Sequence, residues 1–272
     1  MADGGRAFRL SKTVSRARSG VPSGELKGGK SVSMNPTTPG ASSQPLHFHS
    51  IQPVERDRLT AALRFIWAIP QLIVVAFVYI GAFFVAIVGW FGALITGELP
   101  DFAQDYLSGA VRWGVRVNGY LYFLTDAYPP FSLDEDLNYP IHIYIPQRAP
   151  LNRLAVLFRI ILVIPAAIVG SVVGAGLGIL SVGSWAMITF TGSMPIPLFE
   201  ATRAVSRFQL RLAGYFWMLT PEYPWGLLGD LPAAGAVTDE SNGWSIRLSQ
   251  GGRNAMIVVI VLGIIYAIFS RR

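Results

Sequence analysis

Apolar residues gather in three long stretches of the chain. Residues 65–96 and 160–191 each run for about thirty positions without a charged side chain, and residues 255–269 form a shorter third stretch. An α-helix rises 1.5 Å per residue, so about twenty apolar residues cross the hydrocarbon core of a bilayer. The first two stretches therefore predict helices long enough to span a membrane. The third predicts a short transmembrane helix of about 22 Å.

Each of the two longer stretches is followed by a stop signal and a second, amphipathic helix. A Thr-Gly pair ends the apolar run both times, and Pro100 or Pro195 comes shortly after it, which is a normal helix terminus. The pattern then predicts helices at about residues 102–124 and 198–219. Polar side chains recur at every third or fourth position on one face of each helix. They are Gln104, Ser108, Arg112 and Arg116 in the first helix, and Glu200, Arg203, Arg207 and Arg211 in the second.

The two pairs of helices are copies of one another. Residues 58–130 align with residues 153–225 without a gap, at an offset of 95, and 22 of the 73 aligned positions are identical. An ungapped repeat of this length indicates a duplicated helical hairpin, as in many membrane proteins with internal repeats. The sequence therefore predicts an all-α integral membrane protein. Its core is a tandem duplicated hairpin of one long apolar helix and one arginine-striped amphipathic helix, and a short C-terminal transmembrane helix follows.

Two arrangements of the amphipathic helices fit the sequence. In the first, each one returns across the bilayer, so both hairpins point the same way. Arginines open both apolar helices, at Arg64 and Arg159, and this favours the first arrangement because Lys and Arg mark the cytoplasmic side. In the second, the amphipathic helices lie in the membrane interface and the two repeats are inverted. We expect the first, although it places arginines inside the membrane at roughly 2.5–3.5 kcal/mol for each central one.

The repeated arginines of the amphipathic helices are the candidate site residues: Arg112, Arg116, Arg207 and Arg211. One interpretation is a pair of cationic sites, one in each repeat, that contact an anionic lipid head group or an acidic residue of a partner. The other is that these long side chains simply extend to the nearest water. Aromatic residues near the predicted helix ends, such as Trp90 and Trp185, predict an interfacial belt.

Composition supports a membrane protein and places much of its positive charge near the N-terminus. Charged residues make up 14% of the 272 residues, against about a quarter in soluble domains. The net charge is +6. Residues 1–57 are basic and lack apolar periodicity, which predicts a disordered tail. The tail is either a polybasic arm that touches anionic lipid or a solvated segment that orients the first helix. A translation start at Met34 would remove most of it. No apolar core precedes residue 59, so we expect the first helix to act as the insertion signal.

Motifs of known chemistry are absent from the sequence. There is no cysteine, no phosphate-binding loop, no nucleophile elbow and no zinc-protease motif. His47 and His49 form an H-x-H pair without supporting carboxylates. Asp134, Glu135 and Asp136 form an acidic run typical of a solvated loop. We expect no catalytic activity, no cofactor, no metal and no nucleic-acid partner.

Two segments carry a resemblance to a known family. "RLTAALRFIWAIP" and "RWGVRVNGYLYFLTDAYPPFSLD" resemble the domain-of-unknown-function 4389 family, whose members are bacterial membrane proteins that commonly carry the domain in tandem. The resemblance is close over residues 58–135 and looser over residues 153–225, where "TPEYPWGLLGD" replaces "TDAYPPFSLDED". Asp126 and Pro130 therefore have no counterpart in the second copy. The resemblance implies a location in the bacterial cytoplasmic membrane and no known reaction.

The chain divides into six segments: a basic tail at 1–57, a first membrane repeat at 58–135, a linker at 136–152, a second membrane repeat at 153–230, a polar loop at 231–253 and a C-terminal transmembrane helix at 254–270. The alternating "IHIYI" of the linker predicts a short strand. We expect a non-enzymatic accessory or scaffold protein whose partners are membrane lipids, anionic ones included, and another membrane protein. The alternatives are a subunit of a small-molecule or lipid transporter and, third, an enzyme acting on lipid.

Overall fold

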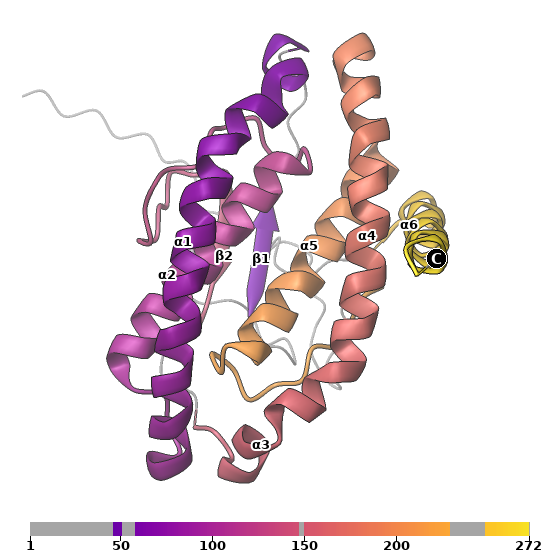
Figure 1. Cartoon of the computed structure of the whole chain (residues 1–272). Helices are drawn as coiled ribbons and strands as arrows, with labels where there is room; N and C mark the ends of the chain where they lie inside the picture. Colours follow the sequence, from indigo (N-terminus) through magenta and orange to yellow (C-terminus); the bar gives the residue numbers. More distant parts are fainter. Residues whose placement is uncertain (1–45, 51–57, 147–149, 229–247, 272) are drawn as a thin grey trace, which may run out of the picture. The chain divides into compact units, whose positions relative to one another are not determined.

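The computed structural model describes residues 46–50, 58–146, 150–228 and 248–271. Helices dominate these residues, and two short strands form the only sheet among them. In chain order the elements are β1 His47–Ser50, α1 Arg58–Thr96, α2 Asp101–Leu121, β2 Ile141–Tyr144, α3 Arg153–Leu157, α4 Arg159–Thr191, α5 Ile196–Phe216 and α6 Gln250–Phe269 (Figure 1).

The three apolar helices of the sequence are confirmed. α1, α4 and α6 are each long and apolar enough to cross a membrane. α1 is continuous through Pro70 and α4 through Pro165. The buried positions of α1 form one narrow stripe, with Ala61, Ala68 and Val75 among them. One side of the helix therefore contacts the rest of the protein, and the remaining apolar surface is exposed.

The duplicated hairpin is confirmed as well, because α2 returns antiparallel to α1 and α5 returns antiparallel to α4 (Figure 1). The Thr-Gly pair explains the sharp turn in both copies. Gly97 and Gly192 have φ angles of 84° and 77°, a left-handed conformation that glycine adopts without steric cost. The hydroxyl groups of the preceding threonines close the turn, since Oγ1 of Thr96 accepts from the amide of Glu98 at 3.2 Å and Oγ1 of Thr191 accepts from that of Ser193 at 3.4 Å.

The two hairpins run in opposite directions, so the expectation that they point the same way is wrong. At one end of the helix layer, Nη2 of Arg58 at the start of α1 donates to the carbonyl of Thr191 at the end of α4, at 3.4 Å. At the other end, the amide of Leu151 just before α3 donates to the carbonyl of Gly97 just after α1, at 2.8 Å. α1 and α4 are therefore antiparallel neighbours (Figure 1), and the repeats are inverted.

The linker between the hairpins causes this inversion. The chain leaves α2 beside the start of α1, where Nη1 of Arg64 binds the carbonyl of Thr125 at 3.1 Å. It then returns along the length of α2, because Nε2 of Gln104 in the first turn of α2 donates to the carbonyl of Pro146 at 3.1 Å. This return includes β2, which confirms the predicted strand. The linker thus carries the chain from one end of the first hairpin back to the other before the second hairpin begins. The distribution of charges at the helix ends does not predict this return.

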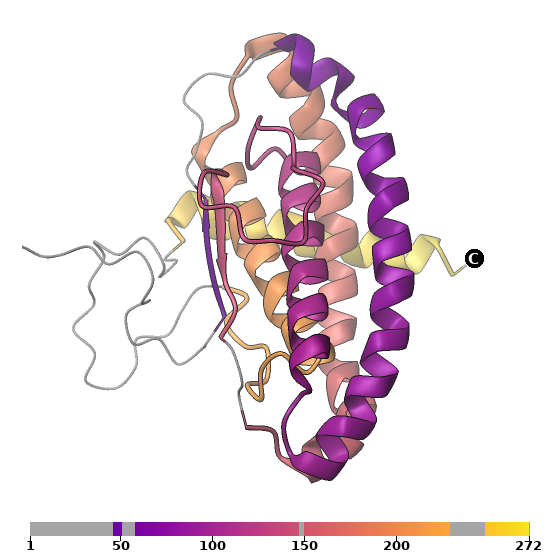
Figure 2. The same cartoon turned by 90° about the vertical axis from the view of Figure 1, so that its left-hand side faces the viewer.

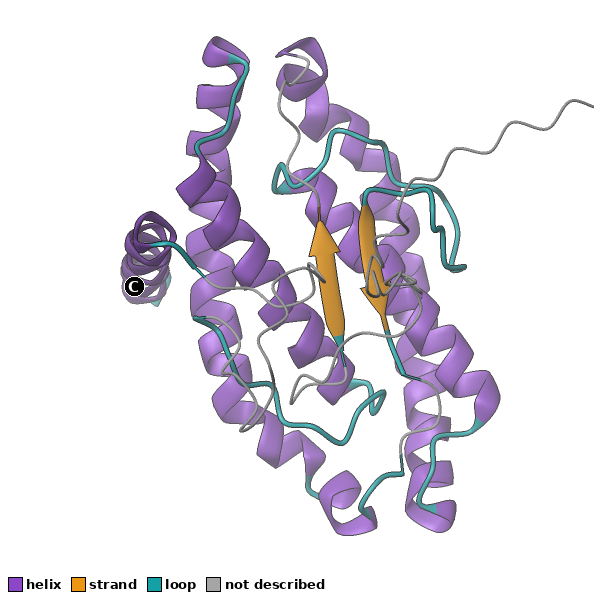
Figure 3. Ribbon diagram, turned by 180° about the vertical axis from the view of Figure 1, so that it is seen from behind, coloured by secondary structure: helices purple, strands orange, loops and turns teal. Residues whose placement is uncertain are grey.

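The strand β2 pairs antiparallel with β1 (Figure 3). The register places His49 opposite His142. β1 falls inside the segment 1–57 that we expected to be a tail without regular structure. Residues 1–45 and 51–57 of that segment lie outside the described part of the chain. β1 contacts α5 and β2 contacts α2. The elements therefore form three layers: the sheet, then α2 with α5, then α1 with α4 (Figure 2).

The last helix crosses these layers. α6 is seen end-on in the view that shows α4 from the side (Figure 1), and from the side after a quarter turn (Figure 2). Glycines allow the close crossing, because a Cβ atom on Gly176 of α4 would lie 1.8 Å from the carbonyl oxygen of Val259 in α6. A Cβ atom on Gly263 of α6 would lie 2.0 Å from the carbonyl oxygen of Val172.

α6 also begins earlier than the sequence predicted, at Gln250, inside the segment expected to be polar loop. The hydroxyl of Ser249 caps the helix by accepting a hydrogen bond from the amide of Gly252 at 3.0 Å. A carboxylate oxygen of Glu200 in α5 accepts from both the amide and the hydroxyl of Ser249, at 3.0 and 2.6 Å. The start of α6 is therefore held against α5.

Candidate functional site

The repeated Gly-Tyr-x-x-x-Leu-Thr sequence forms the same turn at the ends of α2 and α5. The amide of Leu124 donates to the carbonyl of Gly119 at 2.8 Å, and the amide of Leu219 donates to that of Gly214 at 2.9 Å. This is the six-to-one bond of a Schellman motif. The residue before each leucine takes the left-handed conformation although it is not glycine, with φ of 62° at Phe123 and 64° at Met218.

Each of these turns binds one buried arginine from the apolar helix of the same hairpin. Nη1 of Arg64 donates to the carbonyls of Tyr120 and Thr125 at 2.8 and 3.1 Å. In the second hairpin, Nη1 of Arg159 donates to the carbonyls of Tyr215 and Thr220 at 2.7 and 3.3 Å. We call these the first and second arginine sites. All six residues occupy equivalent positions of the repeat.

The physical role of both sites follows from the helix ends. The last carbonyls of a helix lack internal partners and carry the negative end of its dipole, so a cation stabilises them. Arg64 is 0% exposed and Arg159 is 3% exposed, so water does not compete for these carbonyls. Each guanidinium also lies over an aromatic ring, with Cζ of Arg64 4.6 Å from the ring centre of Tyr120 and Cζ of Arg159 4.4 Å from that of Tyr215.

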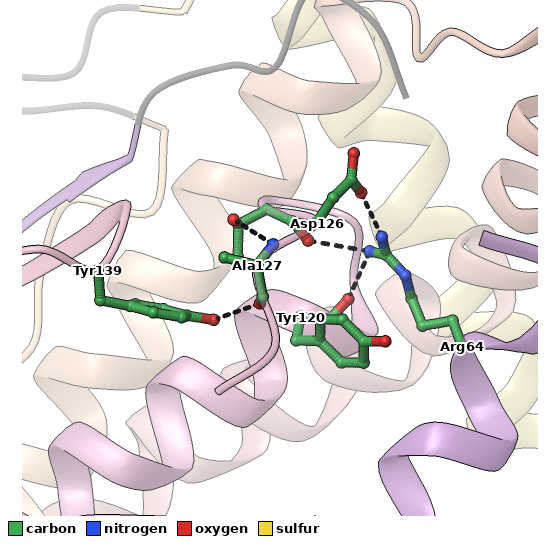
Figure 4. Close-up of polar contacts among 6 residues, drawn as sticks. Arg64, Tyr120, Asp126, Ala127 and Tyr139 are labelled. Atoms are coloured by element: carbon green, nitrogen blue, oxygen red, sulfur yellow. Dashed lines mark hydrogen bonds and ion pairs between the residues drawn. The ribbon is translucent and has the colours of Figure 1, made fainter. Parts of the chain in front are cut away.

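The two arginine sites differ in two respects. Cζ of Arg64 also lies 4.4 Å from the ring centre of Phe123, and the equivalent residue of the second repeat is Met218. Asp126 forms an ion pair with Nη2 of Arg64 in the first site (Figure 4). The equivalent position of the second repeat is Pro221, and no ion pair of Arg159 occurs within the described residues. Figure 4 also shows Tyr139, whose hydroxyl donates to the carbonyl of Ala127 at 3.1 Å. Burial raises the pKa of this hydroxyl, which therefore stays protonated as a donor.

Three of the four arginines predicted as site residues are buried against the loops that follow the turns. Nη2 of Arg116 donates to the carbonyls of Ser132 and Asp134, both at 2.9 Å. Nη2 of Arg207 donates to the carbonyl of Gly226 at 3.0 Å. Nη1 of Arg211 donates to the carbonyl of Trp225 at 3.1 Å. These side chains hold the loop of their own repeat, and contact with lipid or a partner stays a prediction for them.

The fourth predicted residue, Arg112, has a different environment. It is half-buried, and its Nε is buried without a hydrogen-bond partner among the described residues. It lines a small pocket with Glu135, Asp136 and His142. Arg207, at the equivalent position of the second repeat, is 0% exposed. The structure therefore brings the four arginines into the layer between the sheet and the apolar helices, but as two unequal pairs.

Sequence reasoning missed the role of the two repeated tryptophans. Nε1 of Trp90 in α1 donates to the carbonyl of Val156 in α3 at 3.0 Å. Nε1 of Trp185 in α4 donates to the carbonyl of Ala62 in α1 at 3.2 Å. Each indole thus bonds the other hairpin, near the start of its apolar segment. The sequence does show that a tryptophan recurs at this position of both repeats. It does not show which carbonyl each indole binds, because that depends on how the two hairpins associate.

Two larger cavities and a pair of stacked histidines also occur among the described residues. A groove of about 650 Å³ lies beside the first arginine site, and a pocket of about 160 Å³ lies between the hairpins. The rings of His49 and His142 stack with centres 6.3 Å apart. Burial and the nearby charge of Arg203 lower the pKa of His49 below its usual 6.5. Within the described residues, no group of three or more His, Asp or Glu side chains is placed to hold a metal ion.

Comparison with known proteins agrees with the repeat. A family model for a domain of unknown function (DUF4389) matches the chain twice, at residues 58–132 and at residues 153–227. The two matches cover the two hairpins, and each includes one complete arginine site. No curated protein and no solved structure matches the chain. The chain therefore belongs to the DUF4389 family and carries two inverted copies of its domain.

Proposed function

We propose that the protein is a non-enzymatic scaffold or accessory protein of the bacterial cytoplasmic membrane that contacts lipid directly. The observation that carries this proposal is the exposed surface of α1, where large apolar side chains follow one another from Leu59 to Ile95. α4 and α6 add further exposed apolar side chains. Soluble proteins rarely expose contiguous apolar patches beyond a few hundred Å². Acyl chains cover such a surface without ordering water around it.

The use of the buried polar groups supports a structural assignment. Arg64, Arg159, Arg116 and Arg211 all direct guanidinium nitrogens to backbone carbonyls of their own repeat. A catalytic residue needs a group that faces substrate and changes its bonding during the reaction. Arg64 and Arg159 instead satisfy carbonyls at the ends of α2 and α5. Arg116 and Arg211 satisfy carbonyls of the loops that follow these helices.

Extraction from membranes tests the lipid contact. Membranes of cells that express the chain are washed with alkaline sodium carbonate, which removes proteins held only by polar contacts. We expect the chain to stay in the membrane pellet because its exposed apolar helices lie in the acyl region. Quantitative release into the supernatant would overturn the proposal.

Head-group contact is assigned first to Arg112, because its side chain is half-buried whereas Arg116, Arg207 and Arg211 are buried. Glu135 and Asp136 line the same pocket, so a ligand that is anionic throughout meets repulsion there. A head group with both a phosphate and an ammonium fits this pair of charges better. The chain supplies its own control, since Arg207 occupies the equivalent repeat position and is bonded to the carbonyl of Gly226.

The test compares Arg112→Gln with Arg207→Gln in detergent, with phosphatidylethanolamine and phosphatidylglycerol as separate probes in native mass spectrometry. We expect Arg112→Gln to lose retained lipid at an unchanged melting temperature. Arg207→Gln should lower the melting temperature, because the carbonyl of Gly226 loses a charged donor. Unchanged retention of both lipids by Arg112→Gln would exclude head-group contact at this residue and leave the carbonate result unaffected.

A subunit of a small-molecule or lipid transporter is the second candidate, and one observation favours it. Transporters with inverted repeats bind their substrates where the repeats meet. The pocket of about 160 Å³ lies at that place, between Asn118 of α2 and Gln209 of α5. Ser206 lines it, and its buried hydroxyl has no hydrogen-bond partner within the described residues. If the protein supports substrate flux into proteoliposomes and Ser206→Leu abolishes that flux, the result would support this function. Equal flux with and without the protein would exclude it.

A further inference from the structure

The apolar helices are too long to cross a bilayer upright. Exposed apolar side chains run from Leu59 to Ile95 in α1, which is about 54 Å at 1.5 Å per residue. The hydrocarbon core is only about 30 Å thick. To bury this surface by spanning, α1 would have to tilt by about 56°, and transmembrane helices tilt by about 0–40°. The surface of α4 from Ile160 to Phe190 spans about 45 Å and meets the same difficulty.

A polar loop lies beside the middle of the first hairpin. Leu133 packs against the middle of α2, since a Cβ atom on Gly109 would lie 2.8 Å from the Cβ of Leu133. The next residues, Asp134 and Glu135, are exposed. If α1 spanned a bilayer, these carboxylates and their irregular backbone would face lipid at mid-depth. Irregular backbone that faces lipid does not occur there, because its polar groups find no partners.

The sheet and α6 add two independent constraints. The sheet has two strands within the described residues and runs along α2 and α5, on the side away from α1 and α4 (Figures 2 and 3). Its edges need water when the helices are embedded. α6 crosses α4 at the close contact of Gly176 and Gly263. The three apolar helices therefore cannot all cross one bilayer along the same direction.

We infer that α1 and α4 lie in the plane of the membrane, inside one leaflet, with their exposed apolar faces among the acyl chains. This inference rests on the proposed membrane function and deepens it. α2 and α5, which carry the buried arginines, then lie at the level of the head groups, and the sheet lies in water. α6 starts beside α5, where Glu200 binds Ser249, and enters the bilayer end-on with an exposed apolar end that includes Ile264, Ile268 and Phe269. This orientation replaces the multiple crossings that hydropathy alone indicates.

Two matched positions distinguish the orientations. Glu98 follows α1 and Ser193 follows α4, both side chains are exposed, and they occupy equivalent positions of the repeat. Because the hairpins are antiparallel, the two positions lie at opposite ends of the helix layer. The chain has no cysteine, so Glu98→Cys and Ser193→Cys are introduced singly. Each is treated with an impermeant maleimide in spheroplasts and in inverted membrane vesicles. We expect both cysteines to react in the same preparation. Reaction of one in spheroplasts and of the other in inverted vesicles would overturn the inference.

A depth measurement along α1 provides a second readout. Ile66, Phe77, Phe84 and Ile95 are exposed and lie within about 20° of one line along the helix, over about 44 Å. Nitroxide labels at these positions are compared in vesicles of phosphatidylethanolamine and phosphatidylglycerol, by collision with oxygen and with a water-soluble nickel complex. We expect one depth for all four labels.

Two other depth profiles would each refute the inference. Labels that are deep at the centre of α1 and shallow at both ends would show that it spans. Labels that neither reagent reaches would show that a second copy or another protein covers the face in place of lipid. The carbonate extraction separates these results from failure of the proposed function, because a spanning or protein-covered chain still stays in the membrane pellet.

Discussion

Replacing Arg159 by methionine should destabilise the protein strongly, although the residue lies in an apolar helix where methionine is the more usual residue. The substitution removes two hydrogen bonds from a charged donor, to the carbonyls of Tyr215 and Thr220 at 2.7 and 3.3 Å. Each such bond contributes about 1.5–3 kcal/mol. The desolvation cost of the guanidinium is recovered, and methionine fills part of the space. The net loss should be about 3 kcal/mol.

The assay is thermal unfolding in detergent at a fixed scan rate, followed by tryptophan fluorescence. A loss of about 3 kcal/mol lowers the melting temperature by about 6–12 °C for a chain of this size. Arg58→Met is the matched control, because Arg58 is exposed and its bond to the carbonyl of Thr191 is long, at 3.4 Å. Its free energy of unfolding should therefore change by no more than about 0.5 kcal/mol. Equal melting temperatures for Arg159→Met and the wild type would refute the role assigned to both arginine sites.

Three further predictions concern the first arginine site, the helix crossing and the sheet. Asp126→Asn removes the carboxylate that forms an ion pair with Arg64. The side chain of Asp126 is 24% exposed, so the free energy of unfolding should fall by about 1–2 kcal/mol in the same thermal assay. Gly263→Val places a side chain against the backbone of α4; the close approach of the helices should be lost, and proteolysis should release α6 faster than in the wild type. Burial lowers the pKa of His49, so the unfolded state binds the proton first as pH falls below 6.5. Stability should therefore be complete above pH 6.5 and decrease below it, and His49→Gln should flatten this decrease in melting temperature measured against pH.

The arginine sites show how much of the candidate site was open to sequence reasoning. The repeat itself marks Arg64, Tyr120 and Thr125 as positions that recur with Arg159, Tyr215 and Thr220. The repeat does not show which residues bind one another, because Arg64 is separated along the chain from the carbonyls of Tyr120 and Thr125 by 56 and 61 residues. A charged residue at the edge of an apolar helix is ordinarily a marker of the cytoplasmic side. In this protein the charged residue is instead buried, and it binds carbonyl groups at the end of the next helix of its hairpin.

The sequence by itself determined the elements whose causes are local. Apolar runs of about thirty residues specify α1 and α4, Thr-Gly specifies the turns that follow them, and the ungapped offset of 95 specifies that the hairpin occurs twice. Periodicity and turn chemistry act over a few residues, so they can be read without knowing what a segment touches.

Only the tertiary structure decided the direction of the second hairpin, the partners of the arginines and tryptophans, and the crossing of α6. Each depends on contacts between segments far apart in the sequence. The second hairpin is inverted because the linker returns along α2. Individual hydrogen bonds hold the linker there, such as that from Gln104 to the carbonyl of Pro146. The crossing of α6 depends on two glycines, Gly176 and Gly263, meeting across 87 positions. Such contacts form because unpaired backbone groups and exposed apolar surfaces of one element pair with those of another. No pattern of neighbouring residues specifies which elements will pair.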